Sequence, residues 1–240
     1  MAGAELNPSA LSCVQSADAG EKRCEGTLTS MVAPLIEVDN PRVSGLAALE
    51  RGASAEEALA FFDSLPPMPA SMMIAAWRGS VLQTGHRLNG VMEALGWHGK
   101  RFEGPEAVHP LVFGKPGALF SVDPAYAPIR LVERWAWIVK SPALTPIARG
   151  ALEFWRTDKP KGRLRTTEFR GVATATMIYD ALPIHDVFRK VDADTALGLM
   201  DRRGDKAPAY FFFVLRRDGP ATIPLPVKAK EPVYVGAQPV

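Results

Sequence analysis

TEFRGVATATMIY, residues 167–179, carries the clearest structural signal in the chain. Its side chains alternate with the period of two that is typical of a β-strand. One face of the predicted strand comprises Phe169, Gly171, Ala173, Ala175, Met177 and Tyr179, and the other comprises Glu168, Arg170, Val172, Thr174 and Thr176. Pro183 ends the pattern, because proline is poorly tolerated inside a sheet. We therefore predict one strand along this whole stretch.

Three shorter strands are predicted after it, at Val187–Val191, Thr195–Met200 and Tyr210–Arg217. The segments between them, 192–194 and 202–208, have the composition of turns. A parallel crossover needs a dozen or more residues, so these short connections predict an antiparallel meander.

The upstream half predicts helices followed by strands. Ser54 has the residue type of a helix N-cap, Glu57 is its capping-box partner, and Pro66 ends that helix. A second helix is predicted over about Leu88–Leu95, followed by Gly96. Extended segments are predicted at Trp97–Phe102, Val108–Phe113 and Gly117–Val122. Residues 129–155 fit neither the helical nor the strand period.

These elements indicate an α+β protein that is predominantly antiparallel β, built as a barrel or a strongly curved sheet with N-terminal helices. Residues 1–32 are rich in Ala, Ser, Gly and Glu, and we predict that they form a flexible tail. Residues 33–140 hold the helices and the first strands. Residues 141–240 form a strand-rich C-terminal part, which we expect to share one core with residues 70–140.

The composition excludes several classes of protein. Of 240 residues, 47% are hydrophobic and 22% charged, which is typical of a soluble globular protein and not of a disordered, collagen-like or membrane-spanning chain. The net charge of +2 argues against a nucleic-acid partner. No P-loop, no GxGxxG and no Cys/His metal spacing occurs in the sequence, so we expect neither a cofactor nor a metal.

The two cysteines, Cys13 and Cys24, both lie in the predicted tail and cannot form a disulfide across the core. This cysteine usage indicates a reducing compartment, so we expect a cytoplasmic protein. No apolar segment of signal-peptide type follows Met1, and we expect no secretory signal. No motif in the sequence predicts the oligomeric state.

Catalytic candidates are few. His185 is close in sequence to Asp180 and Asp186, an arrangement that would suit a general base held by a carboxylate. His86 is a second candidate base. Asp and Pro in this segment also indicate an ordinary turn, which we favour. No GxSxG nucleophile motif is present, and we expect binding rather than catalysis.

The segment Arg149–Arg170 is basic. Its aromatic residues Phe154 and Trp155 would allow contact with a nucleic acid or with an anionic membrane. A solvated connection is the alternative that we favour, because the whole chain is near neutral. Seven bases stand against three acids: Arg149, Arg156, Lys159, Lys161, Arg163, Arg165 and Arg170 against Glu153, Asp158 and Glu168.

Short motifs in the sequence resemble two known domains. Residues 75–79, AAWRG, resemble the namesake motif of the GXWXG domain, although Ala75 stands where the motif has its first glycine. Residues 85–88 and 95–102 extend this similarity. Residues 179–184, 188–192 and 198–201 are similar to the domain of unknown function 4334 that accompanies it. The resemblance covers about residues 70–217 and implies a lipocalin-like barrel that holds an apolar ligand.

The leading functional prediction is a soluble intracellular carrier or sensor of a small hydrophobic molecule, such as a fatty acid or a related lipid. It requires a hollow barrel, and the sequence does not distinguish a hollow barrel from a filled one. Arg170, Arg189 or Tyr179 would anchor a carboxylate. The other candidate ligand-binding residues are aromatic or sulfur-containing: Trp77, Trp97, Phe113, Met177, Phe188, Met200, Phe211 and Phe213. The alternatives are an enzyme for an apolar small molecule, and an interaction module that uses the basic segment.

Overall fold

The computed structural model describes residues 40–126 and 129–220. Within them, one antiparallel sheet contains ten strands. The strands are β1 (Ala76–Val81), β2 (Trp97–Gly104), β3 (Ala107–Phe113), β4 (Phe120–Val122), β5 (Arg156–Thr157), β6 (Gly162–Phe169), β7 (Val172–Tyr179), β8 (Ile184–Lys190), β9 (Thr195–Arg202) and β10 (Phe211–Gly219). The predicted tail and both cysteines lie outside the described residues.

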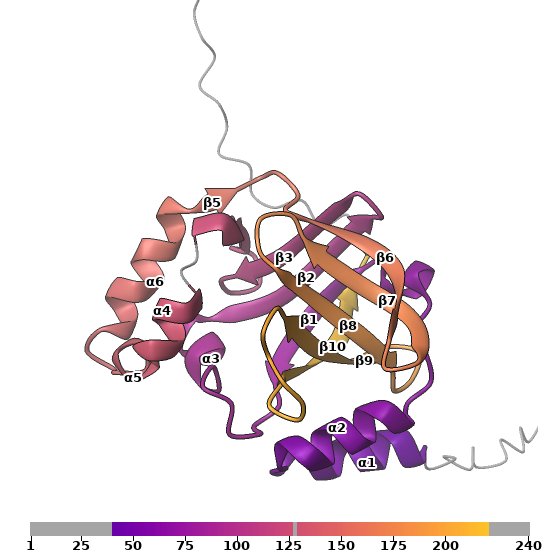
Figure 1. Ribbon diagram of the computed structural model, residues 1–240. Helices are drawn as coiled ribbons and strands as arrows, with labels where there is room; N and C mark the ends of the chain where they lie inside the picture. Colours follow the sequence, from indigo (N-terminus) through magenta and orange to yellow (C-terminus); the bar gives the residue numbers. More distant parts are fainter. Residues whose placement is uncertain (1–39, 127–128, 221–240) are drawn as a thin grey trace, which may run out of the picture. The chain divides into compact units, whose positions relative to one another are not determined.

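Eight of these strands form a closed barrel (Figure 1). Their hydrogen-bonded order is β2-β1-β10-β9-β8-β7-β6-β3, and a pairing between β2 and β3 closes the ring. β4 and β5 continue the sheet from β3 outside this ring. The prediction of an antiparallel β-barrel with a few helices is confirmed. The sheet takes strands from both sides of position 141, so the two predicted parts of the chain contribute to one barrel.

The single strand predicted over residues 167–179 is wrong in detail, because the stretch contains a turn. β6 ends at Phe169, β7 begins at Val172, and these two residues pair with each other. Arg170 and Gly171 both have positive φ, at 52° and 76°. A two-residue turn of this kind matches the twist of a β-hairpin. The three strands of the meander are confirmed, with ends that differ from the predicted ones by at most three residues.

The helices of the described residues are short. They are α1 (Pro41–Glu50), α2 (Ala55–Ser64), α3 (Val91–Leu95), α4 (Ile129–Arg134), α5 (Ala136–Val139) and α6 (Thr145–Phe154), with the 3-10 turns η1 (Ala70–Met73) and η2 (Pro124–Tyr126). The predicted capping box of α2 is confirmed, since Glu57 N donates to Ser54 Oγ at 3.1 Å and Ser54 N donates to Glu57 Oε2 at 2.8 Å. The segment 129–155, which the sequence left ambiguous, is mostly helical.

The second predicted helix is shorter than expected. Gly90 at its start has φ of 80°, a left-handed conformation that interrupts a helix from Leu88. The helix α3 therefore begins at Val91, and Gly96 caps its end as predicted. Helix α1 and strand β1 were not predicted.

Alternating side chains separate the barrel interior from an outer layer. In β10, Phe211 and Phe213 belong to the interior cluster, whereas Phe212 packs with the outer cluster. Helices α1 and α2 cover that outer face with Leu46, Phe62 and other apolar side chains. The run of three phenylalanines thus serves two separate cores.

One end of the barrel interior is filled. Buried side chains of the strands and of the segment before β1 pack there against one another: Met68, Met73, Trp77, Phe102, Met177 and Phe188. Trp77 is anchored by its indole, whose Nε1 donates to Met73 O at 2.8 Å. The other end, where β7 and β9 finish and β2, β8 and β10 begin, holds the cavity described below.

Candidate functional site

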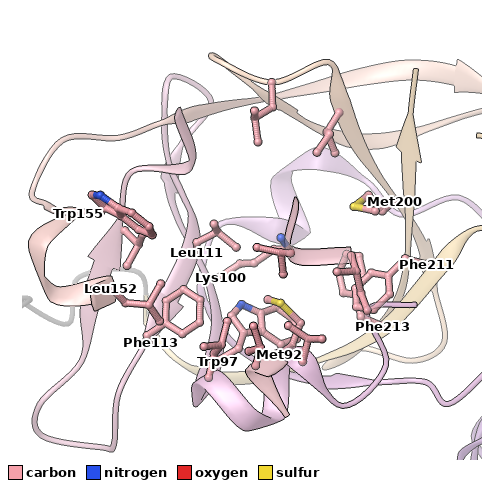
Figure 2. Close-up of a pocket in the computed structure, with 18 of the residues that line it drawn as sticks. Met92, Trp97, Lys100, Leu111, Phe113, Leu152, Trp155, Met200, Phe211 and Phe213 are labelled. Carbon is pink, nitrogen blue, oxygen red and sulfur yellow. The ribbon is translucent and has the colours of Figure 1, made fainter. Parts of the chain in front are cut away.

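The cavity has a volume of about 250 Å³. Barrel strands, helices α3–α6 and strand β4 all contribute residues to its wall. Figure 2 shows Phe113, Leu152 and Trp155 on one side of the space and Met200, Phe211 and Phe213 on the other. The remaining lining residues are also mostly apolar: Leu88, Val91, Met92, Leu95, Trp97, Lys100, Leu111, Val122, Val132, Val139, Ala148, Ala151, Tyr179, Leu182, Ile184 and Asp186.

A buried ion pair interrupts this apolar wall. Lys100 Nζ lies 2.7 Å from Asp186 Oδ2, and the two side chains are only 3% and 2% exposed. Lys100 also donates to Pro110 O at 3.1 Å. Tyr179 OH lies 3.4 Å from both Lys100 Nζ and Asp186 Oδ2 and completes a buried polar group of three side chains.

Aromatic rings surround the ammonium group of Lys100. Its Nζ lies 5.7 Å from the ring centroid of Trp97, 5.6 Å from that of Tyr179 and 5.0 Å from that of Phe213. Cation–π attraction at such distances stabilises a desolvated cation. The rings therefore help to hold the charge of Lys100 inside an apolar space.

Burial shifts the pKa of both acidic groups in this cluster upward. Desolvation raises the pKa of the Asp186 carboxyl, and the nearby charge of Lys100 opposes that rise. Desolvation also raises the pKa of the Tyr179 hydroxyl well above its ordinary value, and the charge of Asp186 acts in the same direction. Tyr179 consequently stays protonated and able to donate a hydrogen bond at neutral pH.

Two buried polar atoms of the wall have no hydrogen-bond partner among the described residues. They are Asp186 Oδ1, an acceptor, and Trp97 Nε1, a donor. A buried polar group that stays unsatisfied costs about 1–3 kcal/mol. Both atoms belong to residues that line the cavity, one as a possible acceptor and the other as a possible donor.

Glycines make room for two of the lining rings. A Cβ at Gly79 would overlap the indole of Trp97, and a Cβ at Gly198 would overlap the ring of Phe213. The two rings meet edge to face, with centroids 6.0 Å apart. Gly79, the last residue of the GXWXG-like motif, thus has a packing role that determines where Trp97 lies.

The structure brings six of the predicted ligand-binding residues together in the cavity wall: Trp97, Phe113, Tyr179, Met200, Phe211 and Phe213. Trp77, Met177 and Phe188 lie instead in the filled end of the interior, fully buried and away from the lining.

The two arginines predicted to anchor a carboxylate lie elsewhere. Arg170 occupies the β6–β7 turn and pairs with Asp63 at 2.6 Å. Arg189 is directed to the outer face of β8, where its guanidinium lies 5.3 Å from the ring centroid of Phe62. Inward positions of β8 are Asp186 and Phe188, so Arg189 alternates to the other side.

The predicted histidine–aspartate pair is not assembled. His185 is exposed, whereas Asp186 is buried in the interior, because neighbours along a strand point to opposite faces. Asp180 is exposed and pairs with Arg163 at 3.0 Å. His86 is half-buried and its Nδ1 accepts from Leu88 N at 3.2 Å. None of the four histidines is among the described residues that line the cavity.

Sequence reasoning missed Lys100 and gave Asp186 a different role. Lys100 lies two residues before Phe102, and both side chains are buried, so a strand period through Phe102 would have placed the lysine inward. A register shift between Trp97 and Gly99 disturbs that period at the start of β2. The lining residues of α4–α6 carried no strand signal that could have indicated them.

The described residues contain no cluster of three or more His, Cys, Asp or Glu side chains placed to hold a metal ion. Among the same residues, no helix is both long and apolar enough to cross a bilayer.

Comparison with known proteins identifies two domains. The model described as "GXWXG protein" matches residues 60–117, and the "Domain of unknown function (DUF4334)" matches residues 160–217. A crystal structure of a protein from Thermomonospora curvata is similar, with 27% identity over 75% of this chain and 97% of that chain and a TM-score of 0.53. A search of curated proteins gives no match. The two matches, to the GXWXG model and then to DUF4334, are those that the resemblance in the sequence predicted.

Proposed function

We propose that this protein is a cytoplasmic carrier or sensor that binds a small hydrophobic molecule, such as a short lipid, in the barrel cavity. The observation that supports the proposal most directly is the wall of the cavity, which is apolar except for one buried polar group. Ligand sites typically have such walls, with a few polar groups that fix orientation.

The size of the cavity favours a compact ligand. Its volume of about 250 Å³ lies just below the range of roughly 300–1,000 Å³ that is usual for drug-sized ligands. The filled end of the barrel, with Phe102 and Phe188 in contact at a centroid distance of 5.8 Å, blocks any deeper extension. A long acyl chain would therefore have to leave the barrel between the helices.

The alternative functions have less support. His185 and Asp186, which would form the acid–base pair of an enzyme for an apolar small molecule, lie on opposite faces of β8. The bases of the segment 149–170 are partly neutralised by ion pairs of Arg163, Arg165 and Arg170 with acidic side chains. Neutralised bases contribute little to nucleic-acid binding.

Native mass spectrometry of gently purified protein tests the proposal, together with displacement of a fluorescent hydrophobic probe. We expect a mass above that of the bare chain, or displacement of the probe by small apolar molecules. A bare mass combined with no probe binding would exclude the proposed function.

A matched pair of variants shows whether binding occurs in the cavity. Ala151 on α6 lines the cavity, so Ala151→Phe should fill part of it and weaken probe binding. Ala193 is exposed in the turn between β8 and β9, so Ala193→Phe adds the same ring outside the cavity. Circular dichroism of both variants checks that the barrel is retained.

A further inference from the structure

The unpartnered atoms of the cavity wall indicate what the polar end of the ligand is. Asp186 Oδ2 is occupied by Lys100 and Tyr179, but Asp186 Oδ1 has no partner. Trp97 Nε1 also lacks a hydrogen-bond partner. An occupant that satisfies both must present a donor to the carboxylate and an acceptor to the indole.

We propose that the ligand is an uncharged molecule with a hydroxyl group, bound with that group toward Asp186 and Trp97. The proposal rests on the function proposed above. A hydroxyl can donate one hydrogen bond and accept two, so it has both the donor that Asp186 Oδ1 lacks and the acceptor that Trp97 Nε1 lacks. Hydrogen bonds to an ionised acceptor are about twice as strong as those between neutral groups.

The charge balance of the site argues against a charged ligand. Among the described residues that line the cavity, Lys100 is the one cationic side chain. Its charge is already balanced by Asp186, with 2.7 Å between Nζ and Oδ2. A carboxylate would bring a second negative charge beside Asp186 with no further cation to meet it. An ammonium group would bring a second positive charge close to Lys100, with no further carboxylate to meet it. Burying an uncompensated charge is strongly unfavourable, so a neutral wall favours a neutral guest.

Calorimetry on the full chain with four ligands of one skeleton tests this choice: ethylbenzene, para-ethylphenol, para-ethylanisole and para-ethylbenzoate. We expect para-ethylphenol to bind about ten-fold more tightly than ethylbenzene and para-ethylanisole, which lack the donor. Para-ethylbenzoate should bind most weakly of the four.

The double variant Lys100→Met with Asp186→Leu removes the ion pair and leaves no unpaired charge. It should still bind ethylbenzene and should lose the preference for para-ethylphenol. Trp97→Phe removes the indole donor together with part of the ring. It should reduce the preference for para-ethylphenol in part, which provides a second readout if the double variant does not fold.

The outcomes separate the two proposals. Equal binding of ethylbenzene and para-ethylphenol, or tightest binding of para-ethylbenzoate, overturns the hydroxyl assignment and leaves the binding function intact. Absence of binding by all four ligands, together with a bare mass in native spectrometry, overturns both.

An independent observation concerns the outer surface of the helices. Six of the seven large hydrophobic side chains that are exposed in the described residues lie between positions 126 and 154. Phe154 is 89% exposed, Ile147 69% and Trp137 67%, and the others are Tyr126, Trp135 and Leu144. Clusters of this kind mark interaction sites.

We infer that this helical surface docks on an anionic lipid bilayer. Exposed bases on the same segment outnumber exposed acids: Arg134, Lys140 and Arg149 against Glu153. Tryptophan and basic side chains around an apolar centre suit the headgroup region of a membrane. The surface also adjoins the cavity, because Ala148, Ala151 and Leu152 on α6 line the cavity while Ile147 and Phe154 on the same helix face outward.

Flotation with vesicles tests the docking, with phosphatidylcholine alone compared with phosphatidylcholine mixed with phosphatidylglycerol. We expect binding to the mixed vesicles that weakens as salt increases. The double variant Trp137→Ser with Phe154→Ser should lose it. Val43→Ser changes an exposed apolar residue of α1 and should bind like the native chain.

Two results would overturn the lipid assignment. One is absence of flotation with the mixed vesicles. The other is a result in analytical ultracentrifugation: the native chain self-associates, the double variant does not, and both bind vesicles equally. The surface would then contact a second copy of the chain.

Discussion

Lys100 and Asp186 form their ion pair across the barrel, with 2.7 Å between Nζ and Oδ2. β2 and β8, which carry them, occupy opposite positions in the ring of eight strands. One step further into the interior, Phe102 of β2 meets Phe188 of β8. The polar pair and the aromatic pair thus form two successive layers, and the polar layer faces the cavity.

Removal of one partner of this pair should be strongly destabilising. Asp186→Leu leaves the buried ammonium of Lys100 without a counter-charge, and we expect a loss of about 3–5 kcal/mol in the free energy of unfolding. Adding Lys100→Met should recover most of the loss, because a buried ion pair contributes little beyond an apolar pair of similar size. Urea denaturation measures both. A double variant as unstable as the single one would contradict this account.

Gly79→Ala should destabilise the barrel and weaken ligand binding together, because the added Cβ overlaps the ring of Trp97. Overpacking of this kind costs about 1–3 kcal/mol. Gly150→Ala in α6 is the matched control, since a Cβ there meets no atom within 4 Å. Alanine is favoured over glycine inside a helix, so the control should be neutral or slightly stabilising. Thermal unfolding and probe affinity distinguish the two.

His109 should make stability depend on pH. Burial lowers the pKa of this buried imidazole from 6.5 to about 4. The unfolded chain therefore binds the proton more readily than the folded chain, and the contribution of His109 to stability is lost as the pH falls from 6.5 toward 4. The loss corresponds to roughly 3 kcal/mol.

His109→Gln provides the comparison for that effect. The glutamine does not titrate, so the difference in unfolding free energy between the native chain and the variant should change over this pH interval. A difference that stays constant between pH 7 and pH 4 would show that His109 does not titrate in this way.

Ser54→Ala should remove the capping box of α2 at a cost of about 1 kcal/mol. The helix covers the outer face of the barrel, away from the cavity, so the affinity for ligand should not change. A drop in affinity equal to that of Gly79→Ala would indicate that the outer layer and the cavity are coupled.

Local patterns predicted much of the barrel. The capping box at Ser54 and the glycine after α3 depend on neighbouring residues only, and both were confirmed. The turn at Arg170-Gly171 was missed because an arginine with positive φ is uncommon and the alternation of side chains continued through it.

The site was harder to predict because it depends on contacts between distant strands. Lys100 and Asp186 are 86 positions apart in the sequence, and neither residue signals the other. The neighbourhood of His185 and Asp186 suggested a pair, but strand geometry separates them to opposite faces. The sequence predicted that these aromatic residues share one interior. Which of them line the cavity depends on how the eight strands close into a barrel.

Most of the helical part of the cavity wall comes from a segment that neither domain model matches. Residues 118–159 contain α4, α5 and α6 and stand between the two matched stretches. Helices α4, α5 and α6 therefore come from a different part of the sequence than the eight strands of the barrel. Exchange of this segment between relatives would change the proposed ligand site and the proposed docking surface, and would leave the eight strands of the barrel unchanged.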